Sequence, residues 1–219
     1  MQRVPEPELM LDSEQVLAYA RADFSAPHDH FVALFRERFG NRVSGRVLDL
    51  GCGPGDICRR FANAFPDCTL LGVDGSQPML ELGQTDTRDA GLGDRIEFHY
   101  GHLPETELAE RFDIVISNSL LHHLDDPQVM WQSLRRYGKP GAQVFVMDLL
   151  RPASQDQAAA LVATYAPDEP DILRHDFYHS LLAAWRPDEV NRQLQDQNLS
   201  RLEIEVVSDR HFVVHGKLP

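Results

Sequence analysis

The sequence predicts an α/β fold in which a mostly parallel sheet is covered by helices on both faces. Short apolar segments alternate with helical segments between residues 44 and 150, and strands this apolar are typical of sheets that are buried on both sides. Two further strand-like segments, RLEIEVVSD and HFVVHGKL, stand almost back to back near the end of the chain. We therefore expect a repeating α/β arrangement that ends in an antiparallel pair of strands at one edge of the sheet.

Five apolar segments account for the parallel part of the sheet. They are short and mostly apolar, as buried strands are. In chain order the predicted strands are RVLDL (46–50), TLLGVD (69–74), RIEFHY (95–100), FDIVIS (112–117) and AQVFVMDLL (142–150).

The segments between these strands are predicted to be helical. One helix is expected over about residues 57–65 and another from near Pro78. A third lies within residues 125–138, with Asp126 as its cap and Pro127 in its first turn. We interpret the basic residues near its end, in SLRRYGKP, as cations that complement the helix dipole rather than as a nucleic-acid-binding patch.

Helical segments also flank this core. Before the first strand, residues 14–38 predict one or two helices that break near Pro27. After the fifth strand, residues 151–186 hold two helix-like segments, QDQAAALVATY and HDFYHSLLAAW, and a last helix is expected over residues 187–198. An insertion at the carboxyl end of such a sheet lies where α/β proteins bind ligands, so residues 151–186 either line a site or form plain helical packing.

The bulk composition argues against several classes of protein. The chain has 219 residues, 42% of them hydrophobic, which fits one domain with a substantial core. Its formal net charge of -13 gives no general attraction to phosphate backbones. The cysteines Cys52, Cys58 and Cys68 form no CxxC pair, which argues against a disulfide framework or a structural zinc site and fits a reducing cytoplasm. We expect no membrane span and no signal peptide.

A glycine-rich turn follows the first predicted strand in VLDLGCGPGD, residues 47–56. Gly51, Gly53 and Gly55 carry no side chain, so a ligand can approach the backbone closely at the start of the next helix. The GxGxG spacing differs from the GxGxxG that places a pyrophosphate on a helix N-terminus. Because Asp56 follows directly, we expect this turn to repel a pyrophosphate and to accept a cationic ligand.

Two more acids stand at strand ends beside this turn. Asp74 ends the second strand, where an α/β nucleoside site needs a carboxylate for the ribose diol. Asp49 precedes the glycines and either faces a cationic amino group of the ligand or caps local amides. The spacing to the glycines favours the ligand role.

Several of these segments together resemble one known family. VLDLGCGPGD, LLGVDGSQPML, IEFHYGHLPE, FDIVISNSLLHHLDDP and KPGAQVFVMD occur in the order and spacing of class I S-adenosylmethionine-dependent methyltransferases. The resemblance covers about residues 44–150 and implies a Rossmann-like, doubly wound sheet of seven strands, mostly parallel, with an antiparallel terminal strand. It implies a single domain made of an N-terminal helical cover (1–43), a cofactor-binding core (44–150), the helical insertion (151–186) and a C-terminal helix and strand pair (187–219).

The resemblance also implies which residues bind S-adenosylmethionine. The glycine turn would hold its methionine part, Asp74 the ribose hydroxyls, and Asn118 would lie near the amino group. Ser76 and Met79 would lie beside the adenosine. The implied cofactor-binding residues are Asp49, Gly51, Cys52, Gly53, Gly55, Asp74, Gly75, Ser76, Met79, Gly101, His102, Leu103, Asn118 and Ser119.

One residue departs from the family pattern. After the third strand the family usually has an acid that accepts a hydrogen bond from the adenine amino group, and this chain has His102 there. A neutral imidazole still accepts one hydrogen bond, and Leu103 supplies the apolar contact in either case.

The residues that act on the acceptor are predicted less directly. Methyl transfer from a sulfonium is a direct displacement, so alignment is essential and a general base is optional. His122 and His123, after the fourth strand, either shape the wall of the crevice or act as bases. Tyr178, with His175 and His179, lies in the insertion and is the remaining catalytic candidate.

The insertion and the N-terminal segment each have a purely structural alternative. Phe177, Leu181 and Trp185 in the insertion are consistent with a lid helix that packs its apolar side inward. Tyr19 and Phe24 either cover the cofactor or belong to the ordinary core.

The spaced histidines raise the question of a metal. His175 and His179 are four residues apart, as are His211 and His215, a spacing at which two residues of a helix share a ligand. The segment HFVVH is more typical of a strand, and neither pair has an obvious third ligand. We therefore expect no metal site.

These observations predict an enzyme that transfers a methyl group from S-adenosylmethionine to a small-molecule acceptor. The acidic charge and the apolar, aromatic insertion favour a small molecule over RNA. A binding or regulatory protein that holds S-adenosylmethionine or S-adenosylhomocysteine without catalysis is the alternative, and an RNA methyltransferase is a second one. A nicotinamide oxidoreductase is disfavoured by the glycine spacing.

Overall fold

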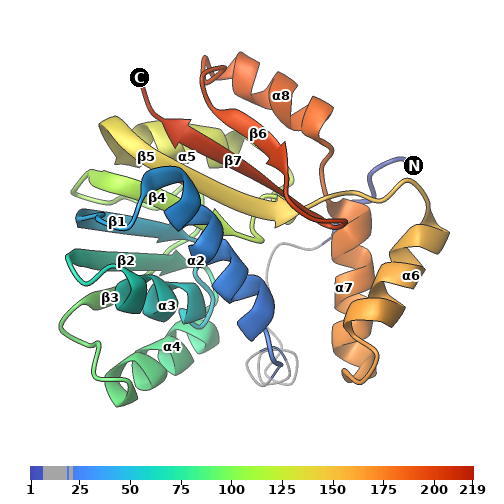
Figure 1. Ribbon diagram of the computed structural model, residues 1–219, viewed down its shortest axis with the longest axis horizontal. Coiled ribbons are helices and arrows are strands. Elements are labelled where there is room, and N and C mark those ends of the chain that lie inside the picture. Colours follow the sequence, from blue (N-terminus) through green and yellow to red (C-terminus); the bar gives the residue numbers. More distant parts are fainter. Residues whose placement is uncertain (7–18, 20–21) are drawn as a thin grey trace.

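A computed structural model describes residues 1–6, 19 and 22–219, and it has the predicted α/β architecture. Seven strands form one sheet in the order β3-β2-β1-β4-β5-β7-β6 (Figure 1). The strands are β1 (Gly45–Leu50), β2 (Cys68–Asp74), β3 (Ile96–Tyr100), β4 (Phe112–Asn118), β5 (Gly138–Leu149), β6 (Glu203–Val206) and β7 (His211–Lys217). The helices are α2 (Ser25–Phe39), α3 (Asp56–Ala64), α4 (Gln77–Asp89), α5 (Gln128–Tyr137), α6 (Gln155–Tyr165), α7 (Asp171–Ala183) and α8 (Pro187–Asp196).

The pairing of the strands confirms the predicted sheet. Strands β1 to β5 pair in parallel, whereas β7 is antiparallel to both β5 and β6. The terminal pair therefore forms a hairpin whose second strand lies inside the sheet and whose first strand is the edge. The strand order reverses direction between β1 and β4, and ligands of open α/β sheets bind at the carboxyl ends of the strands at such a point.

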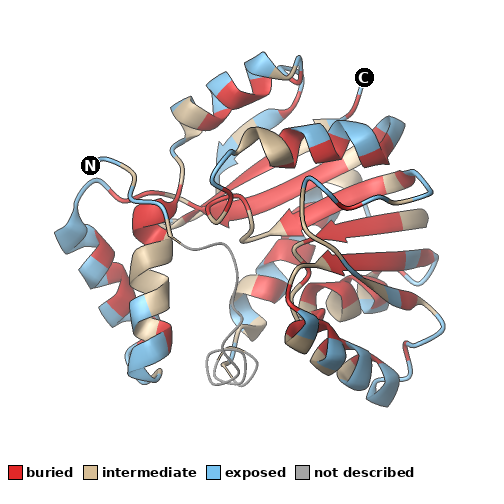
Figure 2. Ribbon diagram, turned by 180° about the vertical axis from the view of Figure 1, so that it is seen from behind, coloured by how far each residue is buried: buried red, intermediate tan, exposed pale blue. Residues whose placement is uncertain are grey.

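Helices cover both faces of the sheet, as the apolar strands require. Alternate side chains of β1 enter different clusters: Val47 packs with Phe35 of α2 and Phe61 of α3, whereas Leu48 packs with Trp131 of α5. Strands β1, β2, β4, β5 and β7 are accordingly buried along most of their length, whereas β3 and β6, at the two edges of the sheet, are more exposed (Figure 2). Burial on both faces explains why these strands read as nearly continuous apolar runs.

Helices α6 and α7 form a separate lobe beyond the carboxyl end of β5 (Figure 1). They pack against each other around a third cluster that includes Leu161, Val162, Leu181 and Leu182. The lobe therefore stands beside the crevice at the switch point, where the position of the insertion in the sequence placed it.

Two helix starts differ from the sequence-based expectation. Pro27 lies within the first turn of α2 and does not break it. The amide of a first-turn residue has no partner within the helix, so a proline is tolerated there. Pro127 is the residue before α5 rather than a member of its first turn, while Asp126 accepts a hydrogen bond from the amide of Gln128 at 2.9 Å.

The remaining elements agree with the prediction where the structure describes them. Of the three basic residues of SLRRYGKP, Arg135 and Arg136 lie in the last turn of α5, whereas Lys139 lies in β5. Of the predicted N-terminal helical segment, residues 14–18, 20 and 21 lie outside the described residues. Among the described helices, none is both long and apolar enough to cross a membrane.

Candidate functional site

The glycine turn after β1 has the backbone conformation that favours glycine, but only part of it faces open space. Gly51, Gly53 and Gly55 have φ angles of 71°, 52° and 72°. A Cβ atom on Gly53 would meet no atom within 4 Å, whereas one on Gly51 would lie 2.9 Å from Leu120. One on Gly55 would lie 2.5 Å from Phe98. Gly53 therefore bares the backbone to a cavity, and Gly55 is small because a ring packs on it.

Asp74 at the end of β2 is held in place by two backbone amides. Its Oδ2 accepts a hydrogen bond from Gly53 N and its Oδ1 accepts one from Ser76 N, both at 2.8 Å. Burial raises the pKa of Asp74, and these two hydrogen bonds act against that rise. The carboxylate thus links the glycine turn to the start of α4.

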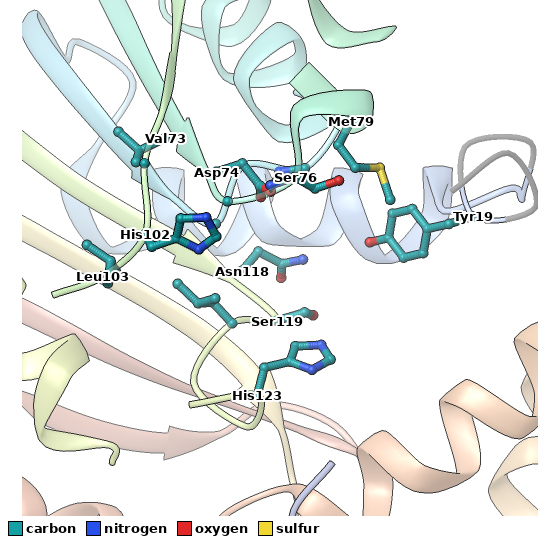
Figure 3. A pocket seen from close by; sticks show the side chains of 15 residues that line it. Tyr19, Val73, Asp74, Ser76, Met79, His102, Leu103, Asn118, Ser119 and His123 are labelled. Atoms are coloured by element: carbon teal, nitrogen blue, oxygen red, sulfur yellow. Dashed lines mark hydrogen bonds between the residues drawn. The ribbon is translucent and has the colours of Figure 1, made fainter. Parts of the chain in front are cut away.

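A first cavity, of about 120 Å³, opens beside Asp74 at the carboxyl ends of β1, β2 and β4. In Figure 3, Asp74, Ser76 and Met79 lie on one side, Asn118 and Ser119 face them, and Tyr19 lies toward Met79. Ser119 is one of two described non-glycine residues with a positive φ, at 56°. The lining of the first cavity includes these sequence-predicted residues: Gly51, Gly53, Asp74, Gly75, Ser76, Met79, Gly101, His102, Leu103, Asn118, Ser119 and His123.

His102 occupies the position where the resembling family has an acid. Its Nε2 lies 2.9 Å from the hydroxyl of Tyr100, and the two rings are at right angles in a T-shaped contact. The imidazole lines the first cavity, so it is placed to contact a ligand there.

A second cavity, of about 160 Å³, lies on the other side of the glycine turn. Asp49 and Cys52 line it together with Gly51 and Gly53, as the sequence predicted, but Gly55 lines neither cavity. Asp49 is 1% exposed, and its carboxylate accepts a hydrogen bond from the Cys58 thiol at 3.1 Å. Burial raises the pKa of Asp49 to about 7, with the thiol acting against it.

Asp56 does not present the free negative charge that the sequence suggested. Its Oδ2 lies 2.6 Å from His28 Nδ1 and 2.7 Å from Arg60 Nε, and Arg59 lies 3.7 Å from its Oδ1. Although burial alone would raise the pKa of Asp56, the hydrogen bonds from His28 and Arg60 lower it to about 2. Of the three acids that the sequence placed at the glycine turn, Asp49 and Asp74 are therefore the two that remain to act on a ligand.

A third and larger cavity, of about 330 Å³, lies between the sheet and the α6–α7 lobe. One face of α7 lines it through Leu173, Asp176, Phe177 and Ser180. The opposite wall comes from Asn118 at the end of β4, from Ser119, His122 and His123 after it, and from Phe24 and His28 at the start of α2. The insertion thus does line a cavity, while Leu181 packs inside the lobe.

Four residues connect the first and third cavities. Tyr19, Asn118, Ser119 and His123 line both. Tyr19 packs its ring 4.7 Å from that of Phe24, and burial raises the pKa of its hydroxyl to about 12, so it stays protonated. The two aromatic residues that the sequence offered as a cover therefore lie at the meeting point of the cavities.

The two histidines after β4 have different surroundings. His122 is 1% exposed, and its Nδ1 lies 2.6 Å from Asp148 Oδ1 at the end of β5. Asp148 also accepts hydrogen bonds from the amides of Leu121 and Leu149, both at 2.7 Å. His123 is less buried and lies at the junction of the cavities.

The structure does not bring Tyr178 to this site, which corrects the prediction. Tyr178 packs against the cluster inside the α6–α7 lobe and does not line the third cavity. On a helix it points about 100° away from Phe177, so the cavity receives Phe177 and Ser180 instead. His175 and His179, with ring centroids 4.3 Å apart, likewise lie off this wall.

Sequence reasoning missed several residues that line these cavities or hold residues that do. Asp148 lines none of the three cavities but holds His122, and its place at the end of a predicted strand next to the crevice was a usable signal. The spacing of Leu173, Asp176, Phe177 and Ser180 at helical periodicity was another. Arg210, which also lines the third cavity, is distant in sequence and gave no local signal.

Comparisons with known proteins agree with this geometry. A family model described as "Methyltransferase domain" matches residues 47–141. The chain is 28% identical over 182 residues to the ubiquinone biosynthesis O-methyltransferase of Pseudomonas syringae pv. tomato, covering 81% of this chain and 74% of that protein.

Solved structures of low sequence identity share the fold. A SAM-dependent methyltransferase from Aquifex aeolicus superimposes with a TM-score of 0.69 at 16% identity, covering 96% of this chain and 100% of that one. The plantazolicin methyltransferase BpumL, solved with a monoazolic desmethylPZN analogue and SAH, gives 0.68 at 13% identity over 94% of this chain and 86% of that one. With its sheet order and the matches to methyltransferases described above, the chain belongs to the class I S-adenosylmethionine-dependent methyltransferases.

Proposed function

We propose that this enzyme transfers the methyl group of S-adenosylmethionine to an oxygen atom of a small molecule held in the third cavity. The observation that carries the proposal is that Tyr19, Asn118, Ser119 and His123 line both the first and the third cavity. A donor in one cavity and an acceptor in the other therefore meet at these residues.

The cofactor would span the first and second cavities. Asp74 would accept hydrogen bonds from the ribose hydroxyls, and the adenine would lie near His102 and Leu103 in the first cavity. The methionine part would pass Gly53 toward Asp49, whose carboxylate suits the ammonium group. Asn118 lines all three cavities, so the sulfonium and its methyl group would lie close to it.

The size of the third cavity supports a small acceptor. Its volume of about 330 Å³ is in the range of small-molecule sites, which run from about 300 to 1,000 Å³. Its walls are the inner face of α7 and the segment after β4. The Pseudomonas relative is named for methylation of oxygen in ubiquinone biosynthesis, which favours an oxygen acceptor here.

The chemical step would be a direct displacement. A lone pair of the acceptor oxygen attacks the methyl carbon, the carbon–sulfur bond breaks, and S-adenosylhomocysteine leaves. The proton of the acceptor hydroxyl passes to His123, while His122, held by Asp148, positions that histidine. Alignment of donor and acceptor alone can supply about 7–11 kcal/mol of barrier reduction.

The test is transfer of a labelled methyl group into fractions of a cell extract. The label is expected in small molecules and not in RNA or protein. Ser180→Phe, which fills the third cavity, should abolish transfer and leave S-adenosylhomocysteine binding by calorimetry unchanged. His175→Phe is the matched control, because its side chain on α7 is 71% exposed and lies off that wall. Label in RNA or protein, or full transfer by Ser180→Phe, would contradict the proposal.

A further inference from the structure

Glu6 is brought to the histidine pair by the first residues of the chain. Arg3 donates hydrogen bonds to the carbonyl oxygens of Ala183 at 2.6 Å and His122 at 2.8 Å, and Val4 N donates to the carbonyl of Leu182 at 3.0 Å. This segment therefore runs between the end of α7 and the segment after β4. The Glu6 side chain is only 11% exposed where it reaches the histidines.

The spacing of these three side chains is that of ligands around one metal ion. Glu6 Oε1 lies 3.2 Å from His123 Nδ1 and 3.5 Å from His122 Nε2. One ligand atom from each of the three residues can be chosen so that all lie within 4.8 Å of one another. Tetrahedral ligands at about 2.0–2.2 Å from an ion are roughly 3.3–3.6 Å apart, so little movement is needed to bind one.

Asp148 supplies the outer partner that metal-binding histidines normally have. His122 Nδ1 is held by the Asp148 carboxylate at 2.6 Å, which leaves Nε2 directed toward Glu6. A carboxylate on the far nitrogen fixes the ring and raises the basicity of the coordinating nitrogen. Asp148 is itself fixed by two backbone amides, so the arrangement is rigid before any ion arrives.

The charges around the cluster also suit a cation. The carboxyl group of Asp148 is buried, that of Glu6 is mostly buried, and Asp176 lies close enough to Glu6 to act on it electrostatically. Arg3, whose guanidinium contacts the carbonyl of His122, opposes a cation but is itself close to Glu189 and Asp125.

We propose that Glu6, His122 and His123 bind a divalent first-row transition ion, with Zn²⁺ or Fe²⁺ as the fitting class. Two imidazoles and one carboxylate are a donor set that such ions prefer and that Mg²⁺ and Ca²⁺ do not. Three protein ligands leave a coordination position open. Both histidines line the third cavity, so the open position faces the acceptor.

The role of the ion rests on the proposed function, although its binding does not. An acceptor hydroxyl that coordinates the ion loses its proton to solvent, because the positive charge stabilises the oxyanion. The oxyanion then attacks the methyl carbon, and His123 serves as a ligand instead of receiving the proton. From the sequence we predicted no metal site, because we considered only the pairs His175/His179 and His211/His215. The proposed site differs from that prediction.

Titration of chelator-stripped protein with Zn²⁺ and with Co²⁺ tests the site. We expect one ion per chain by calorimetry and visible absorption bands from bound Co²⁺. Glu6→Gln should weaken Zn²⁺ binding by more than tenfold, and Asp148→Asn should weaken it about 10–100-fold. Glu169→Gln is the matched control, since Glu169 lines the same cavity outside the cluster and should leave Zn²⁺ binding unchanged.

S-adenosylhomocysteine binding by each variant reports that the fold is intact, because the cofactor cavities do not include Glu6. The proposal is overturned if stripped protein binds no stoichiometric ion, or if Glu6→Gln binds Zn²⁺ as tightly as Glu169→Gln. Label transfer that continues without any ion refutes the metal's role and leaves the methyltransferase proposal standing. Ion binding with no label transfer to small molecules supports the metal site and refutes the methyltransferase proposal.

Discussion

Two carboxylates beside the glycine turn, those of Asp74 and Asp49, differ in how far their surroundings stabilise the negative charge. Asp74 accepts two backbone hydrogen bonds that stabilise its charge, whereas Asp49 has a single thiol donor and is almost wholly buried. Asp74 is therefore a fixed hydrogen-bond acceptor. Asp49 gains its charge near neutral pH and is stabilised in that form by a cation.

Replacement of Asp74 with Ala should weaken S-adenosylhomocysteine binding at least about tenfold. A hydrogen bond to a charged acceptor contributes about 1.5–3 kcal/mol, and each 1.4 kcal/mol is tenfold in affinity. Calorimetry measures the change. Asp113→Ala is the control, because Asp113 also accepts a backbone hydrogen bond, from Arg46 N at 2.9 Å, but lines none of the three cavities. Equal affinity in the two variants would exclude the ribose contact.

Cofactor affinity should rise with pH and level off above about 7, the pKa of Asp49. Only the ionised carboxylate attracts the methionine ammonium group, so binding at lower pH must also release a proton. Calorimetry in buffers of different ionisation enthalpy detects that proton. In Asp49→Asn the pH dependence should disappear, and a rise that persists in this variant would assign the titration to another group.

The same carboxyl group makes stability depend on pH in the opposite direction. The pKa of Asp49 is higher in the folded state than in the unfolded state, so the unfolded state binds fewer protons between about pH 4 and 7. The contribution of Asp49 to the free energy of unfolding therefore falls as pH rises through that range. The free energy of unfolding of the wild type relative to Asp49→Asn should therefore fall as pH rises from about 4 to 7, as denaturant unfolding measures, because the difference cancels groups such as His211 that titrate in the same range. A difference that stays constant with pH would show that Asp49 does not titrate in this range.

At the scale of elements, the glycine turn joins α3 to β3 as well as lining a cavity. Gly55 is the N-cap of α3, and the ring of Phe98 in β3 occupies the space that a Cβ would need. The sequence of this turn suggests only ligand binding, but part of the turn is glycine because helix and strand pack closely there. The single glycine left facing open space, Gly53, is also the one whose amide holds Asp74.

Gly55→Ala should destabilise the protein more than Gly91→Ala. Both positions have a positive φ, at 72° and 70°, so both variants lose about 1–2 kcal/mol from backbone strain. Only Gly55 adds a clash, with Phe98 at 2.5 Å, and overpacking costs about 1–3 kcal/mol more. Denaturant unfolding gives both values, and equal losses would show that the Phe98 ring moves aside freely.

At the scale of the whole molecule, the first residues of the chain fasten the α6–α7 lobe to the sheet. The amino group of Met1 donates to the carbonyl of Ala153, and Arg3 joins the end of α7 to the segment after β4 while lying over the Trp185 ring at 4.2 Å. The third cavity lies between the two parts that are joined in this way, so its width depends on a segment far away in sequence.

Arg3→Ala should loosen the lobe without unfolding the sheet. We expect faster amide hydrogen exchange in α6 and α7 and unchanged exchange in β1 and β4, because Arg3 contacts the lobe and the loops but not these strands. Arg192→Ala is the control, since its ion pair with Asp188 is exposed and should contribute little. Exchange that rises equally in lobe and sheet would show that Arg3 supports the whole fold.

The sequence by itself determined the parallel sheet, the glycine turn and the place of Asp74, because these follow from periodicity and from chemistry within a few residues. The tertiary structure alone decided which charges remain free. It paired Asp56 with His28 and Arg60, turned Tyr178 away from the cavity, and carried Glu6 to His122. These outcomes depend on contacts between segments far apart in the chain, whose relative positions no local pattern contains.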